Sequence, residues 1–178
     1  MPAPLDFETG ACQENPGRPA PTVAAAIDRF VVTWVSLETS YKVKAQRFDS
    51  NGTIHGDELA VGDSASVDQE NPSVAVERDG SFLVAWEKGT VEMQRLNSNG
   101  SFAGDRQQVN TEAIPENSHP EVAAGACGEI GVVWDSHVSA GGDDASRSVQ
   151  GQLFVVPNIF GDGFETGDVS SWTSVSGL

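Results

Sequence analysis

The sequence predicts an all-β protein built from tandem units of about fifty residues, each a sheet of four short antiparallel strands. One apolar frame occurs three times, at Pro21–Trp34, Pro72–Trp86 and Pro120–Trp134. Each copy is followed by further alternating runs that Gly, Asn and Asp separate, and none of these runs has a helical period. A repeat of this length is one supersecondary unit that buries its apolar face against its neighbours.

The second unit begins with two strands joined by a tight turn. Apolar and polar residues alternate in Ser73–Glu77, and the apolar run Ser81–Trp86 follows. Asp79 and Gly80 stand between the two runs. Asp-Gly at such a place is typical of a hairpin in which both central residues have positive φ. The pair therefore predicts a tight β-hairpin.

Two further strands complete the second unit. Thr90–Asn97 alternates again, and Asn99 and Gly100 give a second turn signal. Asp105–Thr111 follows and is interpreted as a short outer strand. The unit therefore holds four strands in about fifty residues, as its repeat length requires.

The first unit follows the same plan. Its strands are predicted at Phe30–Trp34, Lys42–Phe48 and Gly56–Val61. The stretch Gln46–Gly52 matches Gln94–Gly100 almost letter for letter. This match indicates that the third strand and the turn after it are built alike in both units.

The third unit departs from the plan. Its loop, His137–Arg147, is longer and rich in Gly and Asp, and Val149–Phe154 stands where Val43–Phe48 stood. Pro157 then interrupts, where the other units carry an Asn-Gly turn. We therefore divide the chain into a lead-in (1–12), repeat 1 (13–65), repeat 2 (66–114), a divergent repeat 3 (115–156) and a tail (157–178).

Four antiparallel strands per unit, with inner strands more apolar than outer ones, describe the blade of a β-propeller. Propellers typically have four to eight blades, so three do not close a ring. We therefore expect a partial β-propeller, most simply the last three blades of a longer protein. A ring completed by self-association and a sandwich-like stack of sheets are the alternatives.

The units resemble a repeat of large secreted and surface proteins of bacteria, which implies a propeller-like surface module and no particular activity. The resemblance spans about residues 13 to 156. The residues that carry it are Phe30–Trp34, Val43–Asp49, Gly52, Gly56, Glu58, Val109–Thr111 and Pro120–Ala123.

The tail carries a second resemblance. Asp162–Trp172 is similar to a Asp-Gly-Phe-Glu-Ser-Gly-Asp-x-Ser-x-Trp segment that ends many exported proteobacterial proteins. This resemblance implies an export-related tail, and a short strand or a disordered end is the alternative. A similar string opens carbohydrate-binding jelly-roll domains, but only six residues follow Trp172.

The net charge limits the kinds of partner that this chain is expected to bind. The chain has 26 acidic and 10 basic residues and a net charge of −16. Such a field repels nucleic acid and anionic membranes, so neither is an expected partner. No apolar run is long enough to span a membrane. An unknown protein or glycan ligand, or further blades, remain as the expected partners.

The N-terminus has neither a basic stretch nor an apolar run, so no signal peptide is predicted in this chain. With the resemblance above, we expect a secreted or cell-surface location; a cytosolic one is the alternative. The two cysteines, Cys12 and Cys127, cannot form a zinc site alone. They form one disulfide in an oxidising compartment or remain two thiols.

No catalytic residue and no cofactor are predicted. The three histidines, His55, His119 and His137, accompany no Gly-x-Ser-x-Gly elbow, and neither cysteine lies beside a base. Sialidase-like propellers carry Ser-x-Asp-x-Gly-x-x-Trp on a blade hairpin, and here Asp79 and Gly80 are adjacent, so that pattern fails. The repeated tryptophans occupy apolar strands and are predicted to be core residues rather than a sugar-stacking surface: Trp34, Trp86 and Trp134.

The first Asn-Gly hairpin carries several side chains of the kind that bind metal ions. Asp49, Asn51, Asp57 and Glu58 offer oxygen ligands that suit calcium, but their spacing is not that of an EF-hand. An Asn-Gly turn selected for positive φ explains the same residues and is favoured. The counterparts in the second unit, Asn97, Asn99 and Asp105, carry less charge, and Gly141–Asp144 is a further ambiguous acidic loop. No metal site is therefore predicted.

Together these observations predict a non-enzymatic, secreted or cell-surface repeat module for interaction, adhesion or scaffolding. Two alternatives stay open: a fragment of a glycan-acting propeller hydrolase whose catalytic blades are missing, and a calcium-stabilised adhesin segment.

Overall fold

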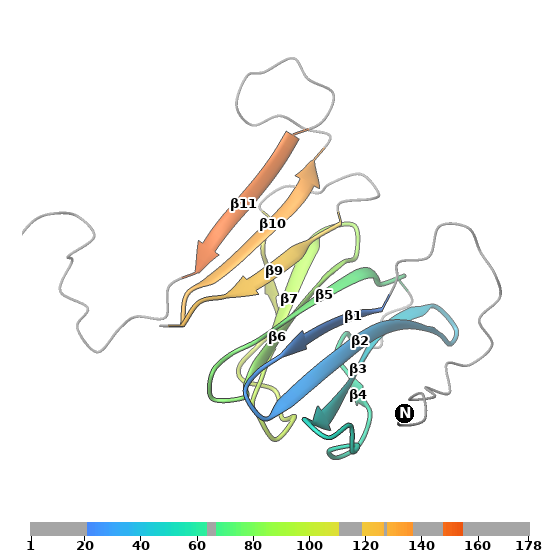
Figure 1. Cartoon of the computed structure of the whole chain (residues 1–178). Helices are drawn as coiled ribbons and strands as arrows, with labels where there is room; N and C mark the ends of the chain where they lie inside the picture. The colour runs from blue at the N-terminus through green and yellow to red at the C-terminus, as the bar shows by residue number, and fades with distance from the viewer. Residues whose placement is uncertain (1–20, 64–66, 111–118, 127, 137–147, 155–178) are drawn as a thin grey trace, which may run out of the picture.

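The computed structural model describes residues 21–63, 67–110, 119–126, 128–136 and 148–154. These residues form three antiparallel sheets that lie side by side (Figure 1). The predicted all-β class, with four-stranded antiparallel sheets, is confirmed. No helix in the described part of the chain is long and apolar enough to cross a membrane.

Strands follow one another in chain order across the first two sheets. The first sheet has the order β1 (Thr22–Ala25), β2 (Arg29–Leu37), β3 (Tyr41–Asp49) and β4 (Leu59–Ala60). The second has the order β5 (Glu70–Val76), β6 (Phe82–Glu87), β7 (Val91–Leu96) and β8 (Gln107–Gln108). The third has β9 (Glu121–Ala124), β10 (Ile130–Ser136) and β11 (Ser148–Phe154), with β10 in the middle.

The first strand of each sheet lies on the same inner edge of the stack. Strand β1 lies beside β5, and β5 lies beside β9. At this edge the Thr22 Oγ1 hydroxyl donates to the Pro72 carbonyl at 3.2 Å. Ser73 Oγ, one residue further along β5, donates to Glu121 Oε2 at 2.7 Å and accepts from the Val122 N–H at 3.1 Å. Successive sheets are thus joined through their innermost strands, as the blades of a propeller are.

The turns differ from the prediction in one respect. Gly80 has φ of 83°, but Asp79 is not among the described residues with positive φ. The Gly80 N–H donates to the Glu77 carbonyl at 3.0 Å, and the Glu77 N–H donates to the Ser81 carbonyl at 2.8 Å. This is a three-residue loop, a type I turn followed by glycine in a bulge, in which only the glycine needs positive φ. The expectation that Asp79 also has positive φ is therefore wrong.

An Asx bond explains why Asp or Asn precedes the glycine in these loops. The Asp79 Oδ1 atom accepts the Ser81 N–H at 2.9 Å, and Asn51 and Asn99 accept the N–H two residues on at the same distance. Gly52 and Gly100 have φ of 86° and 88°. The repeated Asn-Gly signal is therefore a local turn with its own side-chain acceptor.

Strand β6 is buried on both sides and separates two cores. Phe82, Val84 and Trp86 point toward the first sheet, whereas Leu83 and Ala85 point toward the third. Because side chains alternate along a strand, one strand supplies both interfaces. The middle sheet is consequently the centre of the apolar packing in the described part of the chain.

A buried amide closes one end of each of the first two sheets. The Val43 N–H donates to Gln69 Oε1 at 3.1 Å, and the equivalent Val91 N–H donates to Asn110 Oδ1 at 2.8 Å. Gly62 occupies the position of Asn110, and a Cβ atom at Gly62 would overlap the Gln69 amide. The two sheets thus satisfy the same backbone donor with amides from different sequence positions.

Candidate binding pocket between the second and third sheets

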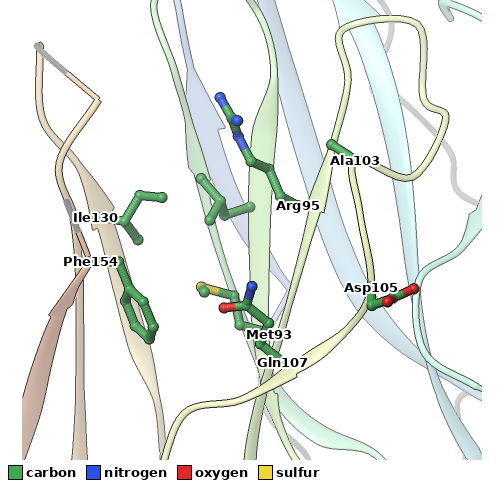
Figure 2. A pocket seen from close by; sticks show the side chains of 8 residues that line it. Met93, Arg95, Ala103, Asp105, Gln107, Ile130 and Phe154 are labelled. Carbon is green, nitrogen blue, oxygen red and sulfur yellow. The ribbon is translucent and has the colours of Figure 1, made fainter. Parts of the chain in front are cut away.

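A cavity of about 300 Å³ lies between the second and third sheets. Strands β6, β7 and β8, with the loop before β8, form one wall, and β10 and β11 form the other. Figure 2 shows Ile130 and Phe154 on one side, opposite Met93 and Arg95. The eight residues that line the cavity are Leu83, Met93, Arg95, Ala103, Asp105, Gln107, Ile130 and Phe154.

The floor of this pocket is apolar. Leu83, Met93 and Ile130 are buried, and Phe154 is partly buried against the same core. Alternation places Met93 and Arg95 on the same face of β7, and Ile130 is paired directly with Phe154 across β10 and β11. The floor therefore continues the core that joins the two sheets.

The mouth of the pocket is polar. Asp105 and Gln107 are exposed, and neither side chain has a hydrogen bond or ion pair within the described part of the chain. Both follow the turn after β7, and Gln94 holds this segment by donating through Nε2 to the Gly104 carbonyl at 3.1 Å. The bond from the Gln94 side chain thus holds the segment that carries Asp105 and Gln107. Figure 2 shows the Asp105 carboxylate directed away from Ile130 and Phe154, so it borders the pocket rather than pointing into it.

Arg95 forms one side of the pocket and is tied to its own sheet. Its Nη2 atom forms an ion pair with Glu77 Oε2, which also accepts the Ser81 hydroxyl. Hydrogen bonds from the Ser81 side chain, and then from its backbone, lower the pKa of Asp79. Arg95 Nε and Glu77 Oε1 are buried without a hydrogen-bond partner. The Arg95 guanidinium is therefore held by Glu77 through Nη2, while its Nε–H donates no hydrogen bond.

The equivalent place between the first and second sheets is filled. Val31, Ala45 and Leu59 stand where Leu83, Met93 and Gln107 stand in the next sheet, and they pack in one core with Phe82 and Leu96. The same positions thus carry different side chains at the two junctions: an apolar Leu59 in the first sheet and a polar Gln107 in the second.

Arg47, the counterpart of Arg95, shows how the first junction is closed. Its Nη1 atom donates to the Ser98 carbonyl of the second sheet at 2.8 Å. Gly56 and Gly100 leave room for its guanidinium, since a Cβ atom at either would collide with it. Burial, and then the charge of Arg29, lower the pKa of Arg47. Arginine at the same position of the repeat thus spans the junction between the first and second sheets as Arg47, and lines the pocket between the second and third sheets as Arg95.

The predicted core tryptophans are buried. Trp34, Trp86 and Trp134 are 8%, 0% and 6% exposed, so none offers a sugar-stacking surface. The indole Nε1 atoms of Trp86 and Trp134 have no hydrogen-bond partner in the described structure. The prediction that these residues serve packing is confirmed.

The described histidines lie apart from the pocket. His55 is exposed in the β3–β4 turn, where Nδ1 lies 3.2 Å from Asp49 Oδ1. His119 is exposed, precedes Pro120 and has φ of 35°. Asn71 precedes Pro72 in the same way with φ of 50°, so the approach to the innermost strand is built alike in two sheets. His137 lies outside the described residues.

Three of the possible calcium ligands in the first unit, Asp49, Asn51 and Glu58, have other partners. Asn51 Oδ1 accepts the Thr53 N–H, and Glu58 Oε1 lies 3.2 Å from Lys44 Nζ. Within the described ranges, His, Cys, Asp and Glu form no group of three or more that could hold a metal ion. Gly141–Asp144, both cysteines and the tail resemblance at Asp162–Trp172 lie outside the described residues.

Of the residues that line the pocket, only Asp105 was interpreted from the sequence as a possible ligand-binding residue. In the sequence Asp105 is the counterpart of a possible calcium ligand of the first unit, whereas the structure places it among the residues that line an apolar pocket. The matching repeats contained an indirect signal, because Gln107 stands where the first unit has the apolar Leu59. The pocket itself depends on the spacing between two sheets, which no local pattern reports.

No protein-family model matches the sequence, and no curated protein matches it. The endo-arabinase of Bacteroides thetaiotaomicron is structurally similar, with a TM-score of 0.50 and 14% identity, over 79% of this chain and 57% of that chain. A GH43 endo-arabinanase from Bacillus licheniformis gives a TM-score of 0.48 and 12% identity, over 75% of this chain and 50% of that chain. The native arabinanase of Bacillus subtilis gives 0.48 and 13% over the same shares.

This chain thus spans only about half the length of the structures it matches. At such low identity the likeness to the Bacteroides endo-arabinase concerns the fold alone. Together with the order of the sheets, it shows that this protein is a partial β-propeller of tandem antiparallel sheets.

Proposed function

We propose that this protein is a non-enzymatic interaction module of a secreted or cell-surface protein, and that the pocket between its second and third sheets receives a side chain of a partner protein. The observation that carries the proposal is the combination of an apolar floor with the exposed Asp105 and Gln107 on its border. Met93 in the floor is a flexible, polarizable residue that adapts to different apolar groups.

We take the pocket to favour a side chain with an apolar stem and a cationic end, because the charge of Arg95 is already paired with Glu77 and Asp105 is the unpaired charge of the lining. A cavity of about 300 Å³ lies at the small end of ligand pockets, so it suits one side chain rather than a large ligand. The net charge of −16 attracts cations to the surface as a whole, and Asp105 provides a local partner. Lysine or arginine of a partner protein meets both requirements.

The experiment uses short peptides with a central Lys or Arg, each paired with the same peptide carrying Met. We expect the basic peptides to bind more tightly than their Met counterparts in a titration followed by NMR. Asp105→Asn should weaken binding of the basic peptides by about two- to fivefold, the range of an exposed ion pair. Ala103→Trp, which fills the pocket, should weaken both kinds of peptide.

Matched controls come from the first sheet. Asp57 and His55 occupy the positions of Asp105 and Ala103 beside the filled junction. Asp57→Asn and His55→Trp should therefore leave binding unchanged. Equal binding by wild type, Asp105→Asn and Ala103→Trp would contradict the proposal, as would tighter binding of neutral sugars than of basic peptides.

The alternative function, a part of a glycan-acting propeller enzyme, is tested separately. Endo-arabinanases are named for the hydrolysis of arabinan, so arabinan is the first substrate to assay, followed by a glycan panel. Release of reducing ends that a single point substitution abolishes would favour the enzyme alternative over the interaction module. Unchanged arabinan together with peptide binding at the pocket would favour the module.

A further inference from the structure

Two charged side chains line the pocket between the second and third sheets, and they point in different directions. Figure 2 shows the Arg95 side chain directed to the side on which Ile130 and Phe154 lie, whereas the Asp105 carboxylate is directed away from them. The Arg95 side chain is 38% exposed, so a ligand can approach its charge. Whether this charge is neutralised therefore affects which sign of ligand charge the pocket accepts.

Glu77 neutralises this arginine, although it is not one of the residues that line the pocket. Its Oε2 atom forms the ion pair with Arg95 Nη2 and also accepts the hydroxyl of Ser81. The side chain of Glu77 is only 7% exposed, and Ser81 is 4% exposed. Because partly buried pairs are screened much less than exposed ones, the carboxylate acts on Arg95 at close range and nearly out of reach of salt.

The first sheet contains the same arginine without such a carboxylate. Ala26 takes the place of Glu77, because each follows the last paired residue of the innermost strand and donates its N–H across the next turn. Arg47, the counterpart of Arg95, forms no ion pair with another described residue and donates instead to the Ser98 carbonyl of the second sheet. The arginine that has a carboxylate beside it thus stays on its own sheet, and the one without it reaches the next sheet.

We infer that Glu77 sets the charge specificity of the pocket: by pairing with Arg95 it lets the pocket accept a cationic side chain and reject a carboxylate. This inference rests on the proposed function of the pocket. Without the charge of Glu77, the positive charge of Arg95 is unpaired, and the same cavity suits a side chain with an apolar stem and a carboxylate end. Glu77 is thus a positioning residue that acts through Arg95.

The test uses three short peptides that differ only in a central Lys, Met or Glu, titrated against the full chain and followed by NMR. Physiological salt screens the net charge of −16. Glu77→Gln keeps the size of the side chain and an oxygen for the Ser81 hydroxyl, but removes the charge. Relative to wild type, this variant should bind the Glu peptide about two- to fivefold more tightly and the Lys peptide about two- to fivefold more weakly. The uncharged Met peptide should bind both proteins alike.

Removal of the arginine should reverse this gain. Glu77→Gln combined with Arg95→Gln carries neither charge, so its affinity for the Glu peptide should return to that of the wild type. Glu77→Ala reproduces Ala26 of the first sheet and should invert the preference as Glu77→Gln does. Circular dichroism establishes that each variant retains its strands. A merely structural role of Glu77 would weaken all three peptides together instead of exchanging the preference between two of them.

The matched control is Glu87→Gln, the same substitution at the other end of β6. Glu87 is 6% exposed, lies outside the pocket lining, and its Oε2 atom accepts from Asn71 Nδ2 at 2.8 Å. It therefore removes an equally buried negative charge from the same sheet. The preference among the three peptides should remain that of the wild type.

The outcomes separate this inference from the proposed function. If the wild type binds the Lys peptide and Glu77→Gln keeps the same preference, the inference is wrong and the proposed function stands. If the wild type binds no basic peptide but Glu77→Gln gains binding of the Glu peptide, and Arg95→Gln removes that gain, the proposed function is wrong and the inference stands. Failure of both Glu77→Gln and Glu77→Ala, when folded, to bind the Glu peptide would overturn the inference.

Discussion

At the residue scale, the first two sheets satisfy one buried backbone donor by different means. In the second sheet Asn110 follows Val109 directly and accepts the Val91 N–H. In the first sheet Gly62 takes the place of Asn110, and the amide arrives from Gln69 seven residues later. A buried N–H without an acceptor costs about 1–3 kcal/mol, so each sheet needs one of the two arrangements.

Because the two positions are equivalent, we expect that an amide at position 62 can replace the amide of Gln69. Gln69→Ala should lower the free energy of unfolding by about 1–3 kcal/mol, because the Val43 N–H loses its acceptor. Gly62→Asn added to Gln69→Ala should recover part of that loss by supplying the amide from the second sheet's position. Urea denaturation followed by tryptophan fluorescence measures both.

The control for this replacement is Gly62→Asn in the presence of Gln69, where two amides compete for one space, so this variant should be less stable than the double variant. Gly131→Ala, at a glycine with open space around it, should change stability by less than about 0.5 kcal/mol. If the double variant is no more stable than Gln69→Ala, the two amides are not equivalent.

Asp79 gives a pH-dependent prediction. Bonds from Ser81 hold its pKa below the ordinary value, so the folded state favours the carboxylate. The resulting stability is present above the unfolded pKa and is lost as the pH falls through the folded pKa. Asp79→Asn keeps the acceptor that Asn51 and Asn99 provide in the other turns, and removes the titration.

The variant should therefore match the wild type near pH 7 and lose less stability than the wild type on acidification. Melting temperatures of both proteins along one pH series measure the difference. Parallel curves over the whole series would show that the Asp79 carboxylate adds nothing to acid sensitivity.

At the scale of elements, the outermost strands depend on a side chain of the strand before them. β4 and β8 each contain only two residues. Gln46 Nε2 donates to the Gly56 carbonyl, and Gln94 Nε2 donates to the Gly104 carbonyl, both at 3.1 Å. These bonds fix the long turn that leads to each outer strand. The matching Gln in both units thus has the same structural role.

Gln94→Glu tests that role, since it keeps the shape but replaces the donor with an acceptor facing two carbonyls. Hydrogen exchange in residues 97–108 should become faster, with a loss of about 1–3 kcal/mol in stability. Gln107→Glu is the control: the same change at an exposed side chain of β8. Equal exchange in the two variants would count against the bond to Gly104 as the anchor.

At the scale of the whole molecule, burial on both sides makes β6 the centre of the apolar packing in the described part of the chain. Residues that face the first sheet alternate along β6 with residues that face the third sheet. The sequence pattern predicted this strand, but it did not predict that both of its faces are covered.

The sequence by itself determined the repeating unit, the four-stranded plan, the positions of the turns and the burial of the tryptophans. These features depend on residues close together in the chain, whose period and turn chemistry are visible in the letters. Only the tertiary structure decided that Arg47 crosses a filled junction while Arg95 borders a pocket, and that Asp105 stands at its mouth. Both outcomes depend on the distance between sheets, which the side chains of two different units set together.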